Sequence, residues 1–178
     1  MSLPEQPRLQ LDLQRLHQYC RLSSALLDCY AEAADVMLWK FHEAPPTSAR
    51  LEVRDETRTI EVLWKAPDAQ ARASHANEKD ATEYAAYAVA FAAVHVAAGY
   101  TVQRRIHQGA GADFLMTRRG EPDNDFIKLE VSGVARGDGL NTRLEEKLKQ
   151  VRGGDLERPG VAVVVGLEAA RILVGETD

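Results

Sequence analysis

The sequence predicts a mixed α/β fold, an α+β arrangement on a mixed sheet, and three observations support this. Residues Asp80–Ala98 are apolar almost all round a helix, which is typical of a helix buried on most sides. The three segments that follow alternate apolar and polar residues and are separated by tight connections, which predicts an antiparallel meander. Residues Val161–Leu167 are apolar throughout, which predicts a strand inside the sheet.

The N-terminal part of the chain predicts a helical segment. Over residues 9–41, leucine, tyrosine, alanine and methionine recur at three- and four-residue steps, as on one face of a helix. A break near Leu22–Ser24 allows two helices instead of one. The tandem prolines Pro45 and Pro46 end the segment, because proline cannot continue a helix.

A β-hairpin is predicted next, over residues 49–65. Leu51 and Val53 alternate with charged residues in its first arm, the second arm shows the same alternation, and residues 55–57 supply the turn. Residues 67–79 are polar and alanine-rich without periodicity. We interpret them as a linker or a marginal helix.

The second half of the chain begins with the apolar helix. Asp80 and Glu83 have the spacing of a capping box, and Gly99 is a natural C-cap. A turn around residues 121–125 separates the second and third strands. The elements expected after the helix are the strands Tyr100–His107, Asp113–Arg118 and Asp125–Ser132, a helix over residues 141–151, the strand Val161–Leu167 and a last short strand over residues 171–174.

Length and composition set the broad class. A chain of 178 residues fits one domain with an appended part, which we divide into an N-terminal helical and hairpin extension, 1–78, and a core, 79–178. The sequence contains no uninterrupted apolar run of about 18 residues, so we expect no membrane span. We also expect no signal peptide. Cys20 and Cys29 are too far apart on one helix to form a bridge. We therefore expect a reduced, cytoplasmic protein.

The segment from Gly109 to Gly133 carries the candidate chemistry. A glycine turn delivers Asp113 to the start of one strand, and Glu130 lies at the centre of the next. Two carboxylates on adjacent strands can share one divalent cation, the smallest unit for metal-assisted phosphodiester hydrolysis. Each residue also has a plain alternative: aspartate is common after a glycine turn, and Glu130 fits the solvent face of a half-buried strand.

Basic residues flank this segment, although the net charge of −5 argues against nonspecific coating of nucleic acid. Arg104 and Arg105 are neighbours in one predicted strand, and so point to opposite faces. Arg105 shares its face with polar residues, which makes it the better candidate for substrate contact. Arg118 and Arg119 are the other basic residues near the site. The alternative is that cross-strand neighbours balance these arginines.

The order helix, three antiparallel strands, helix, strand, together with the two acids, resembles the core of the PD-(D/E)XK nuclease superfamily, the restriction-endonuclease-like fold. Asp113 matches the first motif acid and Glu130 the second. Ala112 replaces the motif proline, and Ser132 occupies the position of the motif lysine. The resemblance implies an αβββαβ core and a Mg²⁺ or Mn²⁺ ion held by the two acids.

The missing lysine leaves the source of positive charge open. Lys128, Glu130 and Ser132 share one face of the predicted strand, so Lys128 could reach the site from the other side of Glu130. Lys147 or Lys149 on the following helix are alternatives. Glu83 resembles the acid often found on the first core helix of these nucleases, but its capping-box position explains it without a function.

The resemblance implies metal-dependent hydrolysis of nucleic acid, with DNA favoured over RNA. Asp113, Glu130, Lys128 and Ser132 are then the candidate catalytic residues. The candidate substrate contacts are Arg105, Arg118, Arg119, Lys147 and Gln150. The alternative is a catalytically inactive interaction module, in a bacterial defence or mobile-element system, whose N-terminal half binds a protein partner or a second copy of the chain.

Overall fold

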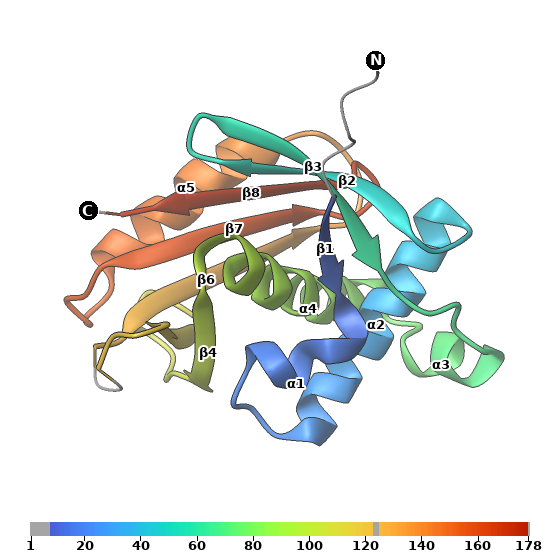
Figure 1. Cartoon of the computed structure of the whole chain (residues 1–178), viewed down its shortest axis with the longest axis horizontal. Helices are drawn as coiled ribbons and strands as arrows, with labels where there is room; N and C mark the ends of the chain where they lie inside the picture. Colours follow the sequence, from blue (N-terminus) through green and yellow to red (C-terminus); the bar gives the residue numbers. More distant parts are fainter. Residues whose placement is uncertain (1–7, 123–124, 178) are drawn as a thin grey trace, which may run out of the picture.

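The structure is a computed structural model that describes residues 8–122 and 125–177. Within these ranges it contains one sheet of eight strands in the order β1-β3-β2-β8-β7-β6-β5-β4 (Figure 1). Parallel and antiparallel pairs occur together, so the predicted mixed sheet is confirmed. The strands are β1 (Leu9–Asp12), β2 (Thr47–Val53), β3 (Glu56–Leu63), β4 (Tyr100–Arg105), β5 (Phe114–Arg118), β6 (Ile127–Val134), β7 (Gly160–Gly166) and β8 (Arg171–Glu176).

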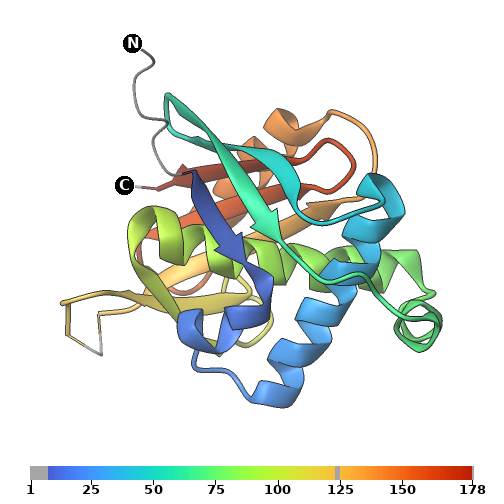
Figure 2. The same ribbon diagram turned by 45° about the vertical axis from the view of Figure 1, so that its right-hand side comes forward.

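Helices cover both faces of this sheet. The sheet curls around α4 (Glu78–Ala98), and α2 (Ser24–His42) packs on the outer side of that helix (Figure 2). The helix α5 (Leu140–Gly153) packs against β6, β7 and β8 from the other face. The short elements are η1 (Leu13–Arg15), α1 (Leu16–Tyr19) and α3 (Ala69–Ser74).

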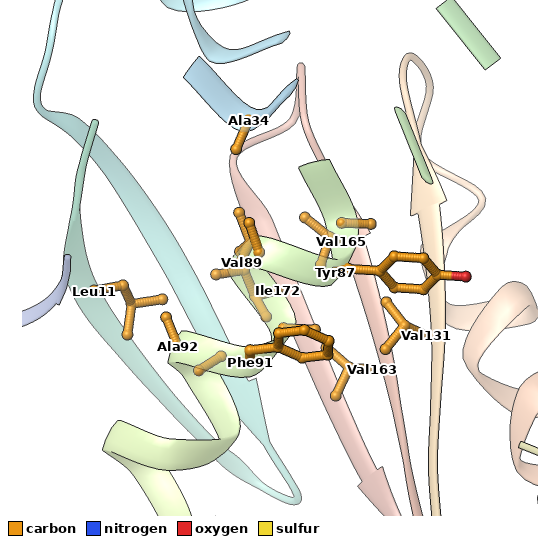
Figure 3. Close-up of a cluster of buried hydrophobic side chains, with 14 of the residues drawn as sticks. Leu11, Ala34, Tyr87, Val89, Phe91, Ala92, Val131, Val163, Val165 and Ile172 are labelled. Carbon is orange, nitrogen blue, oxygen red and sulfur yellow. The ribbon is translucent and has the colours of Figure 1, made fainter. Parts of the chain in front are cut away.

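The helix α4 forms the centre of the core, as its composition predicts. Its side chains Val89 and Phe91 lie among Val131 of β6 and Val163 of β7 (Figure 3). Each fully buried side chain of this size stabilises the fold by about 1.5–3 kcal/mol. By length and composition α4 could also cross a membrane, but 61% of that stretch is buried inside the molecule.

The ends of α4 differ in one respect from the prediction. Gly99 is the C-cap, in the left-handed conformation with φ 71°. The N-cap is Asn77, whose side chain accepts hydrogen bonds from the backbone N–H groups of Lys79 and Asp80. The capping box of Asp80 and Glu83 is therefore wrong, and Glu83 lies in the second turn of the helix.

The N-terminal prediction needs a second correction. Residues Leu9–Asp12 are not helical but form β1, which pairs in parallel with β3. The predicted break is confirmed, with Ser23 as the N-cap of α2. Pairing with β3, far along the chain, determines the conformation of these residues, and the local spacing of the leucines does not predict that pairing.

The predicted hairpin is confirmed as β2 and β3, and it joins the same sheet as the core. Its turn falls at Arg54 and Asp55 and not at residues 55–57 as predicted, because Glu56 and Thr57 already pair with β2. The strand β2 pairs in parallel with β8. The meander β4-β5-β6 is also confirmed. Of the turn predicted around residues 121–125, Asp123 and Asn124 lie outside the described residues.

Candidate functional site

Asp113 lies where the ladder between β5 and β6 ends. The last paired residues are Phe114 and Leu129. The Asp113 backbone N–H donates to the carbonyl of Leu129 at 3.0 Å, and its Oδ2 accepts from the N–H of Val131 at 3.0 Å. The carboxylate thus takes the place of the next backbone acceptor in the ladder, which fixes it at the edge of β6.

The glycine turn before Asp113 packs backbone to backbone against the end of α5. Gly111 has φ 77°, and a Cβ atom there would lie 2.6 Å from the Cα of Gly154. A Cβ atom on Gly154 would lie 2.2 Å from the carbonyl oxygen of the fully buried Ala110. No side chain fits between the two segments, so they hold Asp113 beside α5.

Glu130 is the buried partner of Asp113. Its side chain points to the α5 face of β6 and is 2% exposed. Oε1 accepts a hydrogen bond from Lys147 Nζ at 2.6 Å. Oε2 is buried and receives no donor from the described residues.

The pKa values of both carboxyls are raised, and Asp113 contributes to the shift at Glu130. Burial is the largest cause that raises the pKa of Glu130, to about 7, and the Asp113 charge adds to it against the opposing effect of Lys147. A hydrogen bond between the two carboxyls, which forms when Glu130 is protonated, raises this pKa as well. Burial also raises the pKa of Asp113, and Glu83 adds to it, while the Val131 N–H, Lys147 and Arg105 oppose it. The pair therefore has a deficit of positive charge that a cation or a proton can fill.

The donor set suits a hard cation. Carboxylate oxygens are ligands for Mg²⁺ and Mn²⁺, and Mg²⁺ usually keeps several waters beside one or two carboxylates. Within residues 8–122 and 125–177, no group of three or more histidine, cysteine, aspartate or glutamate side chains is arranged to hold a metal. Asp113 and Glu130 would therefore bind a largely hydrated ion.

The structure separates the candidate lysines. Lys128 is 1% exposed, and its ammonium donates to the carbonyl of Val151 in the last turn of α5. Lys128 thus connects β6 to α5. The expectation that its ammonium reaches the site beside Glu130 is wrong. Lys147 pairs with Glu130 and also donates to Gln150 Oε1 at 3.1 Å, so α5 supplies the charge.

Two pockets meet at the acids. The first, of about 500 Å³, runs from Asp113 and Glu130 over the glycine turn to the end of α5. The second, of about 580 Å³, runs from the same acids between α4 and the first half of α5, and half-buried Ser132 lines it. We call them the glycine pocket and the charged pocket. Together they form a path across the carboxylates.

Arg105 reaches the site from an unexpected face. A bulge between Val102 and Arg104 shifts the register, so that Arg105 pairs with Phe114. The Arg105 side chain therefore lies on the same face as Phe114 and not on the face of the polar residues of β4. Its guanidinium carbon lies 5.5 Å from the ring centre of Tyr87, and its charge lowers the pKa of Asp113. Arg105 lines the glycine pocket. Arg104 points elsewhere, with its guanidinium over the ring of Phe126.

Arg118 and Arg119 do not lie at the acids. Arg118 ends β5, five residues beyond Asp113, which is roughly 16 Å along a strand. Its guanidinium donates to the hydroxyl of Tyr100 at 2.5 Å and lines a different pocket, beside the β2–β3 hairpin. Arg118 is therefore remote from the acids, and contact of Arg118 and Arg119 with a nucleic acid stays a prediction.

Glu83 belongs to the site, although its capping-box position seemed to explain it. Its Oε1 accepts a hydrogen bond from the Tyr87 hydroxyl at 2.6 Å, it lines the charged pocket, and its charge raises the pKa of Asp113. The signal in the sequence was Asn77, an N-cap residue as favourable as Asp80, and its use as the N-cap frees Glu83 from that role.

Comparison of the sequence with protein-family models, with curated proteins and with solved structures finds no match.

Proposed function

We propose that the protein is a divalent-cation-dependent phosphodiesterase acting on nucleic acid, with Asp113 and Glu130 as the cation ligands. One observation carries the proposal. Glu130 Oε2 is buried beside the Asp113 carboxyl and receives no donor from the described residues. A buried carboxylate oxygen without a donor is costly, and a bound cation removes that cost.

Val131 supports the same location for the cation. Its N–H faces Asp113, and in a strand the N–H and C=O of one residue point to the same edge. The Val131 carbonyl is therefore available as a further oxygen ligand. When bound, Mg²⁺ or Mn²⁺ polarises a phosphate oxygen and lowers the pKa of a bound water.

Lys147 takes the role that the resemblance gives to the motif lysine, whose position Ser132 occupies. Its ammonium contacts Glu130 and is 21% exposed, so it can both orient the carboxylate and face a substrate phosphate. A fixed positive charge at this point stabilises the negative charge that develops on phosphate oxygens. Gln150 and Arg105 line the same pocket as the acids, where they can position the strand.

The test measures hydrolysis of labelled DNA and RNA, single- and double-stranded, with Mg²⁺ or Mn²⁺. Asp113→Asn, Glu130→Gln and Lys147→Met should each reduce the rate at least about 100-fold, as loss of one electrostatic group at a reacting centre does. Lys149→Met is the matched control, because Lys149 is exposed on the same helix and lines neither pocket. Its rate should stay within about twofold of wild type.

Cation binding is measured separately by calorimetry with Mn²⁺. Wild type should bind one ion, and Asp113→Asn and Glu130→Gln should bind none or bind it far more weakly. Undiminished Mn²⁺ binding in both variants would contradict the proposed site.

A second candidate function is a catalytically inactive interaction module. The ion pair of Lys147 with Glu130 favours it, because it balances one carboxylate without a cation. Under this alternative the wild-type protein binds no Mn²⁺ and hydrolyses none of the substrates.

A further inference from the structure

The two pockets beside the acids differ in chemistry. Among the described residues, the charged pocket is lined by three basic side chains and two further acids: Lys79, Arg143, Lys147, Glu78 and Glu83. The glycine pocket, away from the acids it shares, presents backbone and amide groups together with Arg105 and His107. The path across the acids therefore leads from a charged compartment into a largely neutral one.

The helix α5 strengthens this difference, because it runs along both pockets. Arg143, one turn into the helix, and Lys147, near its middle, line the charged pocket, and its last residues line the glycine pocket. At the C-terminal end of the helix, the Val151 carbonyl accepts a hydrogen bond from the Lys128 ammonium, and Gln150 and Gly153 line the glycine pocket. The basic side chains of the charged pocket favour a phosphate there, and the backbone and amide groups of the glycine pocket favour a neutral group.

Two glycine backbones form part of the lining of the glycine pocket. Gly111 and Gly154 touch through their backbones, as the contacts of their missing Cβ atoms show. The volume of about 500 Å³ lies in the range of small-ligand pockets, about 300–1,000 Å³. Such a lining can accept a flat ring system close to the backbone.

Gln150 is oriented for recognition at the wall of this pocket. Its Oε1 accepts a hydrogen bond from Lys147, which directs the amide nitrogen away from that lysine. The amide nitrogen of Gln150 is therefore the donor at this wall of the pocket. A side-chain amide is a group that can read the edge of an unpaired base.

We propose that the glycine pocket is a subsite for one unpaired nucleoside next to the reacting phosphate, so that the protein acts on single-stranded polynucleotide. This rests on the proposed function. The burial of Glu130, 2% exposed between the two pockets, agrees with it, because a base held in a duplex cannot enter the recess while its phosphate reaches the acids.

The experiment fills the pocket without disturbing the packing. Gly153 lines it, has no left-handed φ, and a Cβ atom there would meet nothing within 4 Å. Gly153→Leu should reduce hydrolysis of single-stranded DNA or RNA at least about tenfold, with Mn²⁺ binding and melting temperature unchanged. Gly139→Leu is the matched control at the other end of α5, since Gly139 has equally open space and lines neither pocket; its activity should match wild type.

A second variant, Gln150→Leu, keeps the size of the side chain and removes its hydrogen bonds. It should change the preference among the four homopolymer strands, and arms with DNA and with RNA distinguish the two sources of nucleoside. Equal rates on duplex and single strand, or an unaffected Gly153→Leu, would overturn the subsite while leaving the phosphodiesterase in place. If wild type hydrolyses neither kind of strand, the proposed function itself fails.

Discussion

The carboxylate of Asp113 has two tasks that a substitution can separate. One is structural, because Oδ2 accepts the N–H of Val131 at the end of the ladder. The other is electrostatic, because its negative charge lies beside Glu130 and raises the pKa of that residue. Asparagine keeps an acceptor oxygen and removes the charge, whereas leucine removes both.

We therefore expect Asp113→Asn to melt at the same or a higher temperature than wild type at pH 8 without a cation, because the repulsion with Glu130 is gone. Added Mn²⁺ should raise the melting temperature of wild type but not of Asp113→Asn. Asp113→Leu should lose about 1–3 kcal/mol of stability, since the buried N–H of Val131 is left without a partner. If Asp113→Asn loses as much stability as Asp113→Leu, the negative charge of Asp113 does not destabilise the cation-free protein.

The raised pKa values also predict how stability depends on pH. Glu130 titrates near its ordinary pKa when unfolded and at about 7 when folded, so the folded protein binds more protons between about pH 4.5 and 7. Stability of the cation-free protein should therefore fall as pH rises through this window. Asp35, with its pKa raised by burial to about 6, contributes in the same direction.

The difference between wild type and Glu130→Gln isolates the first contribution. Between pH 5 and 8, wild type should lose on the order of 1–3 kcal/mol more than Glu130→Gln, or several degrees in melting temperature. The acids whose pKa is lowered, Glu52 and Glu78, act below this window. If the melting temperatures of the two proteins changed with pH in parallel, Glu130 would not take up a proton on folding.

The sequence located the two acids but not the cations around them. Asp113 and Glu130 could be found because a glycine turn and a strand centre are local features. Lys128 shares the face of Glu130 as predicted, but its length carries the ammonium to Val151 on α5. Arg105 changed face because of a bulge in β4, which local alternation does not encode.

At the scale of elements, the contact between the glycine turn and the end of α5 sets the site. It brings the segment that carries Asp113 to the helix that carries Lys147 and Gln150. Its geometry depends on the absence of Cβ atoms at Gly111 and Gly154. A methyl group at either position must push the two backbones apart.

We expect Gly111→Ala and Gly154→Ala each to lower the free energy of unfolding by about 1–3 kcal/mol, as overpacked sites do, and to weaken Mn²⁺ binding further. Gly153→Ala is the control, because its Cβ atom meets nothing and alanine favours the last helical position. It should be neutral or slightly stabilising in urea denaturation. Equal midpoints for Gly153→Ala and Gly154→Ala would show that the backbones are not in this tight contact.

Elements with strong local signals were predictable and those defined by distant partners were not. The apolar runs of α4 and β7 predicted a buried helix and an internal strand, and the alternation in β6 predicted a strand. The conformation of β1 depends on pairing with β3, some fifty residues away, for example Leu9 with Ile60. The same holds for the parallel pairing of β2 with β8, which makes the hairpin part of the central sheet.

At the scale of the whole molecule, charge distribution limits how a polyanion can bind. The net charge is −5, and among the described residues four basic side chains of lysine and arginine line the two pockets: Lys79, Arg105, Arg143 and Lys147. Each phosphate neutralised on a single strand contributes about 0.7 to the slope of log K against log salt. Binding should therefore be weakly salt-dependent, with a slope no steeper than about −3.

Arg105 and Arg118 provide the comparison that tests this picture. Arg105 lines the glycine pocket, whereas Arg118 lies beside the hairpin at the far end of β5. Binding of a labelled single strand, measured with Ca²⁺ across a salt series, should give a slope shallower by about 0.7 for Arg105→Ala and an unchanged slope for Arg118→Ala. Because the Arg105 guanidinium also contacts Tyr30 at 3.4 Å, its variant is compared at a temperature where both proteins are folded. An equal change in both slopes would mean that the strand contacts Arg118 as well as Arg105 and so extends beyond the two pockets. A slope much steeper than −3 would require basic contacts beyond the four named above.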